Sequence, residues 1–117
     1  MGHTYRQPSS DNLVSGIAAM TDDQADTVIA APGAGSKIVV WAIGVTNADA
    51  SVATKVSIRS NTTAKITLLA AIGGGFIMGP GGSPIFECAA NEAVTAICAD
   101  DSADVNVFVS GTIETAY

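Results

Sequence analysis

The side chains that could carry out acid–base or nucleophilic chemistry are few in this sequence and lie far apart. His3 is the single histidine, and the two cysteines, Cys88 and Cys98, stand near the other end of the chain. A serine nucleophile needs a histidine base beside it, and a zinc site needs closely spaced cysteine and histidine ligands. Paired carboxylates for glycoside hydrolysis would have to face each other in a cleft, whereas the acids here fall in expected turns or near strand ends. We therefore expect no catalytic residue, no cofactor and no metal ligand, and predict that the protein is not an enzyme.

Cys88 and Cys98 flank an expected turn at 91–92. If their strands pair in the right register, a disulfide between them is geometrically feasible. Two thiols do not make the disulfide framework of a small secreted domain. We prefer the interpretation that both are small buried hydrophobic side chains, and the sequence leaves their pairing open.

Two acidic segments resemble each other: 22–26 reads DDQAD and 100–104 reads DDSAD. Carboxylates at this spacing can bind Ca²⁺, but both segments lack the glycine and the distal glutamate of an EF-hand loop. Aspartates also cap turns through bonds to backbone N–H groups, and this is the interpretation we prefer.

Two glycine-rich stretches, 73–75 and 79–82, invite comparison with phosphate-binding loops. Neither is followed by the Lys-Ser/Thr pair of such a loop, so bends with close backbone approach are the better explanation. The Asn61-Thr62-Thr63 stretch matches a glycosylation acceptor, but turn chemistry explains it better.

The chain is acidic and unusually poor in charge. It has 117 residues, with 11 Asp and Glu against 5 Lys and Arg, a net charge of −6, and 14% charged residues. Nucleic-acid binding and anionic membrane surfaces both call for clustered cations, so we expect neither as a partner. A small, charge-poor chain is easier to explain if another copy or another protein covers part of its surface, and we expect a homo-oligomer or an assembly subunit.

Short alternating or apolar segments separated by turn residues predict an all-β fold. The expected strands are 27–31, 37–47, 52–60, 65–71, 76–78, 85–89, 93–99 and 105–113. The alanines within 88–99 could instead support a short helix, although Val94 and Ile97 favour a strand. We expect an antiparallel β-sandwich, jelly-roll-like in arrangement. An immunoglobulin-like sandwich is the second choice, because Trp41 precedes both cysteines instead of lying between them.

The first residues differ in character from the rest. Residues 5–12 are polar, 13–20 form a short apolar patch, and acidic turn residues follow. We expect residues 1–25 to form an extended N-terminal arm and 26–117 to form the sandwich domain.

Candidate contact residues are apolar side chains on the arm or beside the glycine-rich bends: Leu13, Val14, Ile17, Phe76, Ile77 and Met78. Strand alternation also places Lys55, Arg59 and Lys65 on one outward face, as a cationic patch that would suit an acidic partner surface. Trp41 and Phe86 are expected in the core. For 76–78, core and interface are equally good expectations.

Several segments resemble small virion proteins of tailed bacteriophages. These are the APGAGSKIVV opening at 31–40, GGGF at 73–76, ANEAV at 90–94 and VNVFVSG at 105–111. The resemblance covers 27–114 and consists of turns and composition. It implies a capsid decoration (cement) protein: a small β-sandwich, often a homotrimer, that binds the outside of the capsid and stabilises it. The location would be the virion and the partners further copies and the major capsid protein, with the arm contacting the lattice or a neighbour.

Other functions stay open from the sequence. Some proteins of this shape belong to the neck, tail or head fibres of the virion. A carbohydrate- or host-surface-binding module would need exposed aromatic rings. A secreted, disulfide-stabilised domain would need Cys88 and Cys98 to be joined.

Overall fold

The computed structural model describes residues 12–79, 81–100 and 104–116, and these residues form strands, turns and bends without any helix. None of the described residues therefore belongs to a helix able to span a membrane. The strands are β1 (Leu13–Met20), β2 (Asp26–Ile29), β3 (Ser36–Asn47), β4 (Thr54–Ser60), β5 (Thr63–Ala70), β6 (Gly75–Met78), β7 (Phe86–Glu87), β8 (Val94–Cys98) and β9 (Val105–Thr115).

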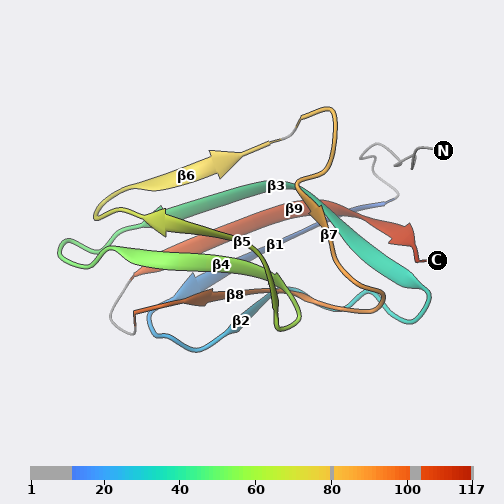
Figure 1. Ribbon diagram of the computed structural model, residues 1–117, viewed down its shortest axis with the longest axis horizontal. Helices are drawn as coiled ribbons and strands as arrows, with labels where there is room; N and C mark the ends of the chain where they lie inside the picture. The colour runs from blue at the N-terminus through green and yellow to red at the C-terminus, as the bar shows by residue number, and fades with distance from the viewer. Residues whose placement is uncertain (1–11, 80, 101–103, 117) are drawn as a thin grey trace.

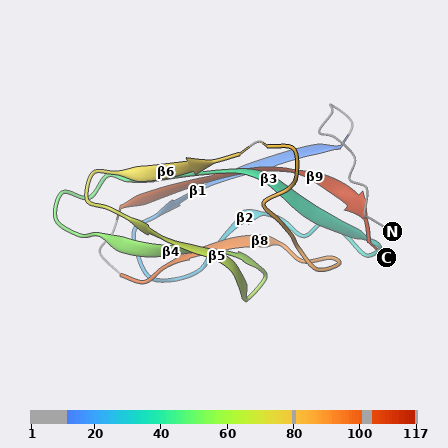
Figure 2. The same cartoon turned by 45° about the horizontal axis from the view of Figure 1, so that its top comes forward.

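The strands form two antiparallel sheets that pack face to face, as the two layers in Figures 1 and 2 show. Sheet A has the order β1-β9-β3-β6, with the short β7 also paired to β3, and sheet B has the order β2-β8-β4-β5. The chain alternates between the sheets: β1, β3, β6, β7 and β9 lie in sheet A and the others in sheet B. This interleaving makes the sandwich jelly-roll-like. It is not the immunoglobulin order, in which strands A and B share one sheet.

The predicted strands agree with the structure from β2 onward. The alternative of a helix within 88–99 is wrong, because Val94–Cys98 is strand β8, paired with both β2 and β4. Its β-branched and apolar side chains pack between neighbours on both sides, which outweighs the helical preference of the alanines. The turns predicted at 61–63 and 91–92 are present, and Asn61 and Asn91 have positive φ angles of 52° and 54°.

The expected arm needs a correction. Leu13–Met20 is the edge strand β1, paired along its whole length with β9, so the sandwich begins at β1 and not at residue 26. Ala18 and Met20 point inward and are buried, whereas Leu13 and Ile17 point outward and are exposed. Because the outward positions other than Ser15 are apolar too, the sequence of β1 lacks the regular polar alternation that marks a strand. The remainder of the expected arm, 1–11, which includes His3, lies outside the described residues.

The core lies between the sheets and consists of small and β-branched side chains. Full burial of one valine or isoleucine contributes about 1.5–3 kcal/mol relative to exposure. The cluster comprises Ala18, Met20, Val28, Ile29, Ile38, Val40, Ile43, Val45, Val56, Ile58, Ala70, Cys88, Val94, Ala96, Cys98, Val105, Val107 and Val109. Phe86, expected in the core, is half-buried and packs against this cluster. Trp41 is buried as expected, at 3% exposure.

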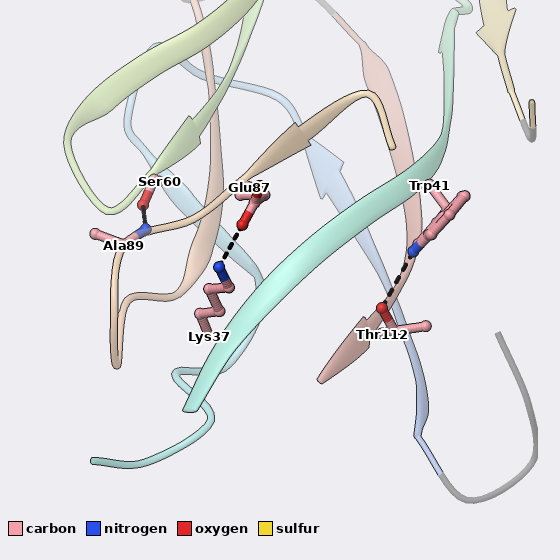
Figure 3. A network of polar contacts seen from close by, with 6 residues as sticks. All are labelled: Lys37, Trp41, Ser60, Glu87, Ala89 and Thr112. Atoms are coloured by element: carbon pink, nitrogen blue, oxygen red, sulfur yellow. Dashed lines mark hydrogen bonds and ion pairs between the residues drawn. The ribbon is translucent and has the colours of Figure 1, made fainter. Parts of the chain in front are cut away.

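Polar contacts hold the segment around β7 against β3 and β4 (Figure 3). The Lys37 ammonium forms an ion pair with the Glu87 carboxylate, across the β3–β7 pair. The Ala89 N–H donates to Ser60 Oγ over 3.0 Å, and Ser60 Oγ in turn donates to Glu92 Oε1 over 2.6 Å. These bonds connect sheet A to the end of β4 in sheet B.

Candidate interaction surfaces

The outer face of sheet A carries a row of aligned apolar positions across four of its strands, β1, β9, β3 and β6. The register pairs Ile17 of β1 with Phe108 of β9, Phe108 with Gly44 of β3, and Gly44 with Ile77 of β6. Ile17, Phe108 and Ile77 are 72%, 43% and 84% exposed. We call these four residues the sheet A row. Such contiguous exposed apolar side chains are typical of interaction sites.

Gly44 interrupts the row and leaves a hollow. A side chain built on Gly44 would meet only Phe108, at 3.9 Å, so the space above this backbone is open. The hollow has a volume of about 340 Å³. Its walls come from the sheet A row together with Val45, Thr46, Asn106 and Val107. The result is an apolar depression with Ile17, Phe108 and Ile77 around it.

No charged residue lies on this part of sheet A. The strand segments 13–20, 42–47, 75–78 and 105–110 contain no Asp, Glu, Lys or Arg. Two polar residues lie next to the sheet A row, Thr46 on β3 and Asn106 on β9. Both are uncharged, and they are register partners. Burying this surface against a partner would therefore desolvate no charge.

The six predicted apolar contact residues divide into two groups. Leu13, Ile17 and Ile77 are exposed on the outer face of sheet A. Val14 and Phe76 are half-buried and pack against the core, and Met78 is half-buried on the edge strand. Sequence reasoning missed Phe108 and Gly44. The alternation of Val105, Val107 and Val109 already placed Phe108 on the opposite face, and this signal could have identified it.

Three cations lie on the outer face of sheet B. Lys55 and Arg59 are on β4, and Lys65 is on β5 at the bulge where the β4–β5 register shifts. Arg59 Nε donates to Thr95 Oγ1 over 3.1 Å, and the hydroxyls of Ser57 and Thr67 bond over 2.8 Å between the strands. Strands β4 and β5 contain no acidic residue. We call Lys55, Arg59 and Lys65 the cationic face.

Several aspartates lie instead at one end of the sandwich, beyond the ends of β1, β3 and β8. There the Ala48 N–H donates to the Asp104 carbonyl, and the Asp100 N–H donates to Thr54 Oγ1. Asp49 caps its turn, and the backbone N–H groups of Ser51 and Val52 hold the pKa of its carboxyl below the ordinary value.

The structure favours turn capping for the first of the two Asp-rich segments. The Gln24 N–H donates to Asp22 Oδ1 over 3.0 Å. No group of three or more histidine, cysteine or acidic side chains is placed to hold a metal ion within the described ranges. Part of the second Asp-rich segment, 101–103, lies outside those ranges.

Both cysteines are free and buried, as the interpretation of small core side chains expects. Burial raises the pKa of the Cys88 thiol, while the nearby Ser60 hydroxyl and the Lys65 charge act in the opposite direction. Burial also raises the pKa of the Cys98 thiol, and the carboxylates of Asp26, Asp100 and Asp22 add to the effect. Neutral thiols in such surroundings are poor nucleophiles.

Comparison with known proteins gives a likeness in structure but none in sequence. No family model matches the chain, and no curated protein matches it. Among solved structures, the chain is similar to one in the "Cyanophage Pam1 capsid asymmetric unit", at 14% sequence identity and a TM-score of 0.43. That alignment covers 95% of this chain and 93% of the other.

Proposed function

We propose that this protein is a structural protein of a tailed-bacteriophage virion, and specifically a capsid decoration protein that binds the shell as a homotrimer. The observation that carries the proposal is the pair of contrasting outer faces of one small sandwich. The outer face of sheet A carries the uncharged sheet A row. The outer face of sheet B carries the cationic face, on two strands that contain no acidic residue. The resemblance of 27–114 to phage virion proteins supports the same assignment.

The two faces suit two different contacts of an assembly subunit. An uncharged apolar face favours association with another copy, because no charge has to be desolvated. The cationic face favours an acidic surface, here the outside of the capsid shell, because opposite charges orient the approach. Several copies joined together would bind a lattice of repeated sites with higher avidity than one copy.

In the proposed function the protein binds other proteins and catalyses no reaction. The two thiols are buried in the core, Asp22 and Asp49 cap turns, and Glu87 forms an ion pair with Lys37. A rigid sandwich that contributes contacts, and not chemistry, is consistent with these placements.

A carbohydrate-binding role is less well supported. Sugar recognition by stacking needs exposed aromatic rings, and Trp41, the largest ring, is 3% exposed. Among the described residues, Phe108 is the most exposed ring, and it stands in the apolar row between Ile17 and Gly44.

The test is binding to phage heads. Purified, fluorescently labelled protein is titrated against emptied heads of the phage that carries its gene, and the bound fraction is measured by sedimentation. We expect saturation at many copies per head, together with heads that resist heating or low salt better when the protein is bound. Saturation at a few copies would indicate a neck or tail position, and binding to a glycan array without binding to heads would contradict the proposal.

A further inference from the structure

We infer that the outer face of sheet A is the contact between copies of this chain, with Ile77 of one copy inserted into the hollow over Gly44 of the next. The inference rests on the homo-oligomer part of the proposed function and adds the surface and the residues that form it.

The charge distribution favours a second copy as the occupant. Each copy carries a net charge of −6, so two copies repel each other electrostatically in most relative orientations. The sheet A row lies within strand segments that contain no charged residue, and several aspartates lie at one end of the molecule. Two copies that meet through the sheet A row bury no charge and keep these carboxylates in water.

The shape of the face also favours a second copy, because it supplies both a protrusion and a matching depression. Ile77 is 84% exposed on β6, which is the edge strand of sheet A. The hollow of about 340 Å³ lies over the inner strand β3, where Gly44 has no side chain. Ile77 and the hollow adjoin on the same face, because Gly44 and Ile77 are register partners. Two copies can therefore exchange the contact about a two-fold axis, with Ile77 of each copy in the hollow of the other.

The area available is adequate for a stable contact. The molecule measures 47 × 26 × 26 Å, and the uncharged segments run along roughly half of its length. That gives a face on the order of 600 Å², close to the ~800 Å² per partner of a standard protein interface. Adjoining edge residues of β1 and β6, such as Leu13, add to it.

The experiment is sedimentation equilibrium of the full chain at micromolar concentration, without phage heads. We expect the wild type to sediment at a multiple of 11.7 kDa. Ile77→Asp should raise the Kd for association of the copies by about tenfold or more, because a carboxylate would enter an apolar contact. Gly44→Val should do the same by filling the hollow. Its Cβ would meet only Phe108, at an ordinary 3.9 Å, and valine is favoured in strands.

Leu69→Asp is the matched control, because Leu69 is 62% exposed on the outer face of sheet B. It should leave the mass of the oligomer unchanged, and circular dichroism should show that all three variants are folded. A monomeric wild type would overturn the inference. Equal masses for the wild type and Gly44→Val, or dissociation by Leu69→Asp, would overturn it as well. A monomer that still saturates heads would overturn the contact between copies and leave the capsid-binding part of the proposed function standing. An oligomer that does not bind heads would overturn only the proposed function.

Discussion

The indole nitrogen of Trp41 donates a hydrogen bond to the Thr112 hydroxyl over 3.1 Å, at the point where β3 carries a bulge (Figure 3). Trp41 is the extra residue between the Val40–Gly111 and Ala42–Ser110 pairs. A bulge inserts one extra residue into one strand of an antiparallel pair. The side-chain bond therefore connects β3 and β9, the two central strands of sheet A, at the point where their register shifts.

Replacing Thr112 by valine should destabilise the protein at this bulge. Valine keeps the shape of the buried threonine but removes the acceptor of the Trp41 bond, which costs about 1–3 kcal/mol. The free energy of unfolding is measured by urea titration with Trp41 fluorescence as the signal. Thr112→Ser keeps the hydroxyl and should retain more of the stability than Thr112→Val. Equal losses in the two variants would show that packing, and not the hydrogen bond, accounts for the effect.

Two strand glycines in sheet A should respond in opposite ways to alanine. A Cβ on Gly16 would lie 1.8 Å from the Val28 carbonyl oxygen, so β1 or β2 must move. We expect Gly16→Ala to lower the free energy of unfolding by about 2 kcal/mol or more, as with other severe backbone clashes.

Gly44→Ala is the control for this clash, because its Cβ would meet only Phe108, at 3.9 Å. Glycine within a strand costs backbone entropy, so this alanine should be neutral or stabilise by about 0.5–1 kcal/mol. Thermal and urea unfolding of both variants check the prediction. A Gly16→Ala variant as stable as the wild type would show that β1 is not held against β2 as described.

The strands from β2 to β9 were predictable because each carries its own signal. The turn residues Asn61 and Asn91 adopt the left-handed conformation that asparagine tolerates, and they separate strands whose inward positions are apolar. The same alternation correctly puts Lys55 and Arg59 on one side of β4. Local patterns of this kind predict strands and turns correctly because they do not depend on contacts with residues far away in the sequence.

Strand β1 and the hollow over Gly44 were not predictable in this way. The outward face of β1 is apolar at Leu13 and Ile17, so no polar alternation marks it as a strand. The hollow exists only because the register places Phe108 and Ile77 on either side of Gly44, and register depends on residues far apart in the sequence. Exposed apolar residues such as Leu13 and Ile17 are thus the ones that a sequence pattern assigns poorly.

The two cysteines should be unreactive until the protein unfolds. Both thiols are buried and free, and burial raises the pKa of each above the ordinary cysteine value. Iodoacetamide at pH 8 should modify neither in the native protein and both in denaturant, as mass spectrometry would show. Finding no free thiol in denaturant would contradict the structure and favour a disulfide-stabilised domain.

The raised pKa of these thiols also gives a direction for the pH dependence of stability. A group whose pKa is higher in the folded state favours folding fully below its unfolded pKa, and this contribution is lost as pH rises through the folded pKa. The free energy of unfolding should therefore decrease at alkaline pH, above the ordinary cysteine range. A Cys88→Ala/Cys98→Ala double variant should show a smaller alkaline decrease in urea titrations at increasing pH, even though it is less stable at neutral pH.

Reversing charge on the cationic face should weaken binding to phage heads, if the proposed function is correct. Lys55 and Lys65 lie on neighbouring strands whose residues include no acid, so glutamates there would turn attraction toward an acidic shell into repulsion. We expect Lys55→Glu/Lys65→Glu to reduce head affinity by about tenfold or more at low salt, with the difference from wild type shrinking as salt screens the charges. Lys55→Arg/Lys65→Arg keeps both charges and should bind as the wild type does. If the glutamate variant bound heads with wild-type affinity at all salt concentrations, the shell would have to contact another surface of the sandwich.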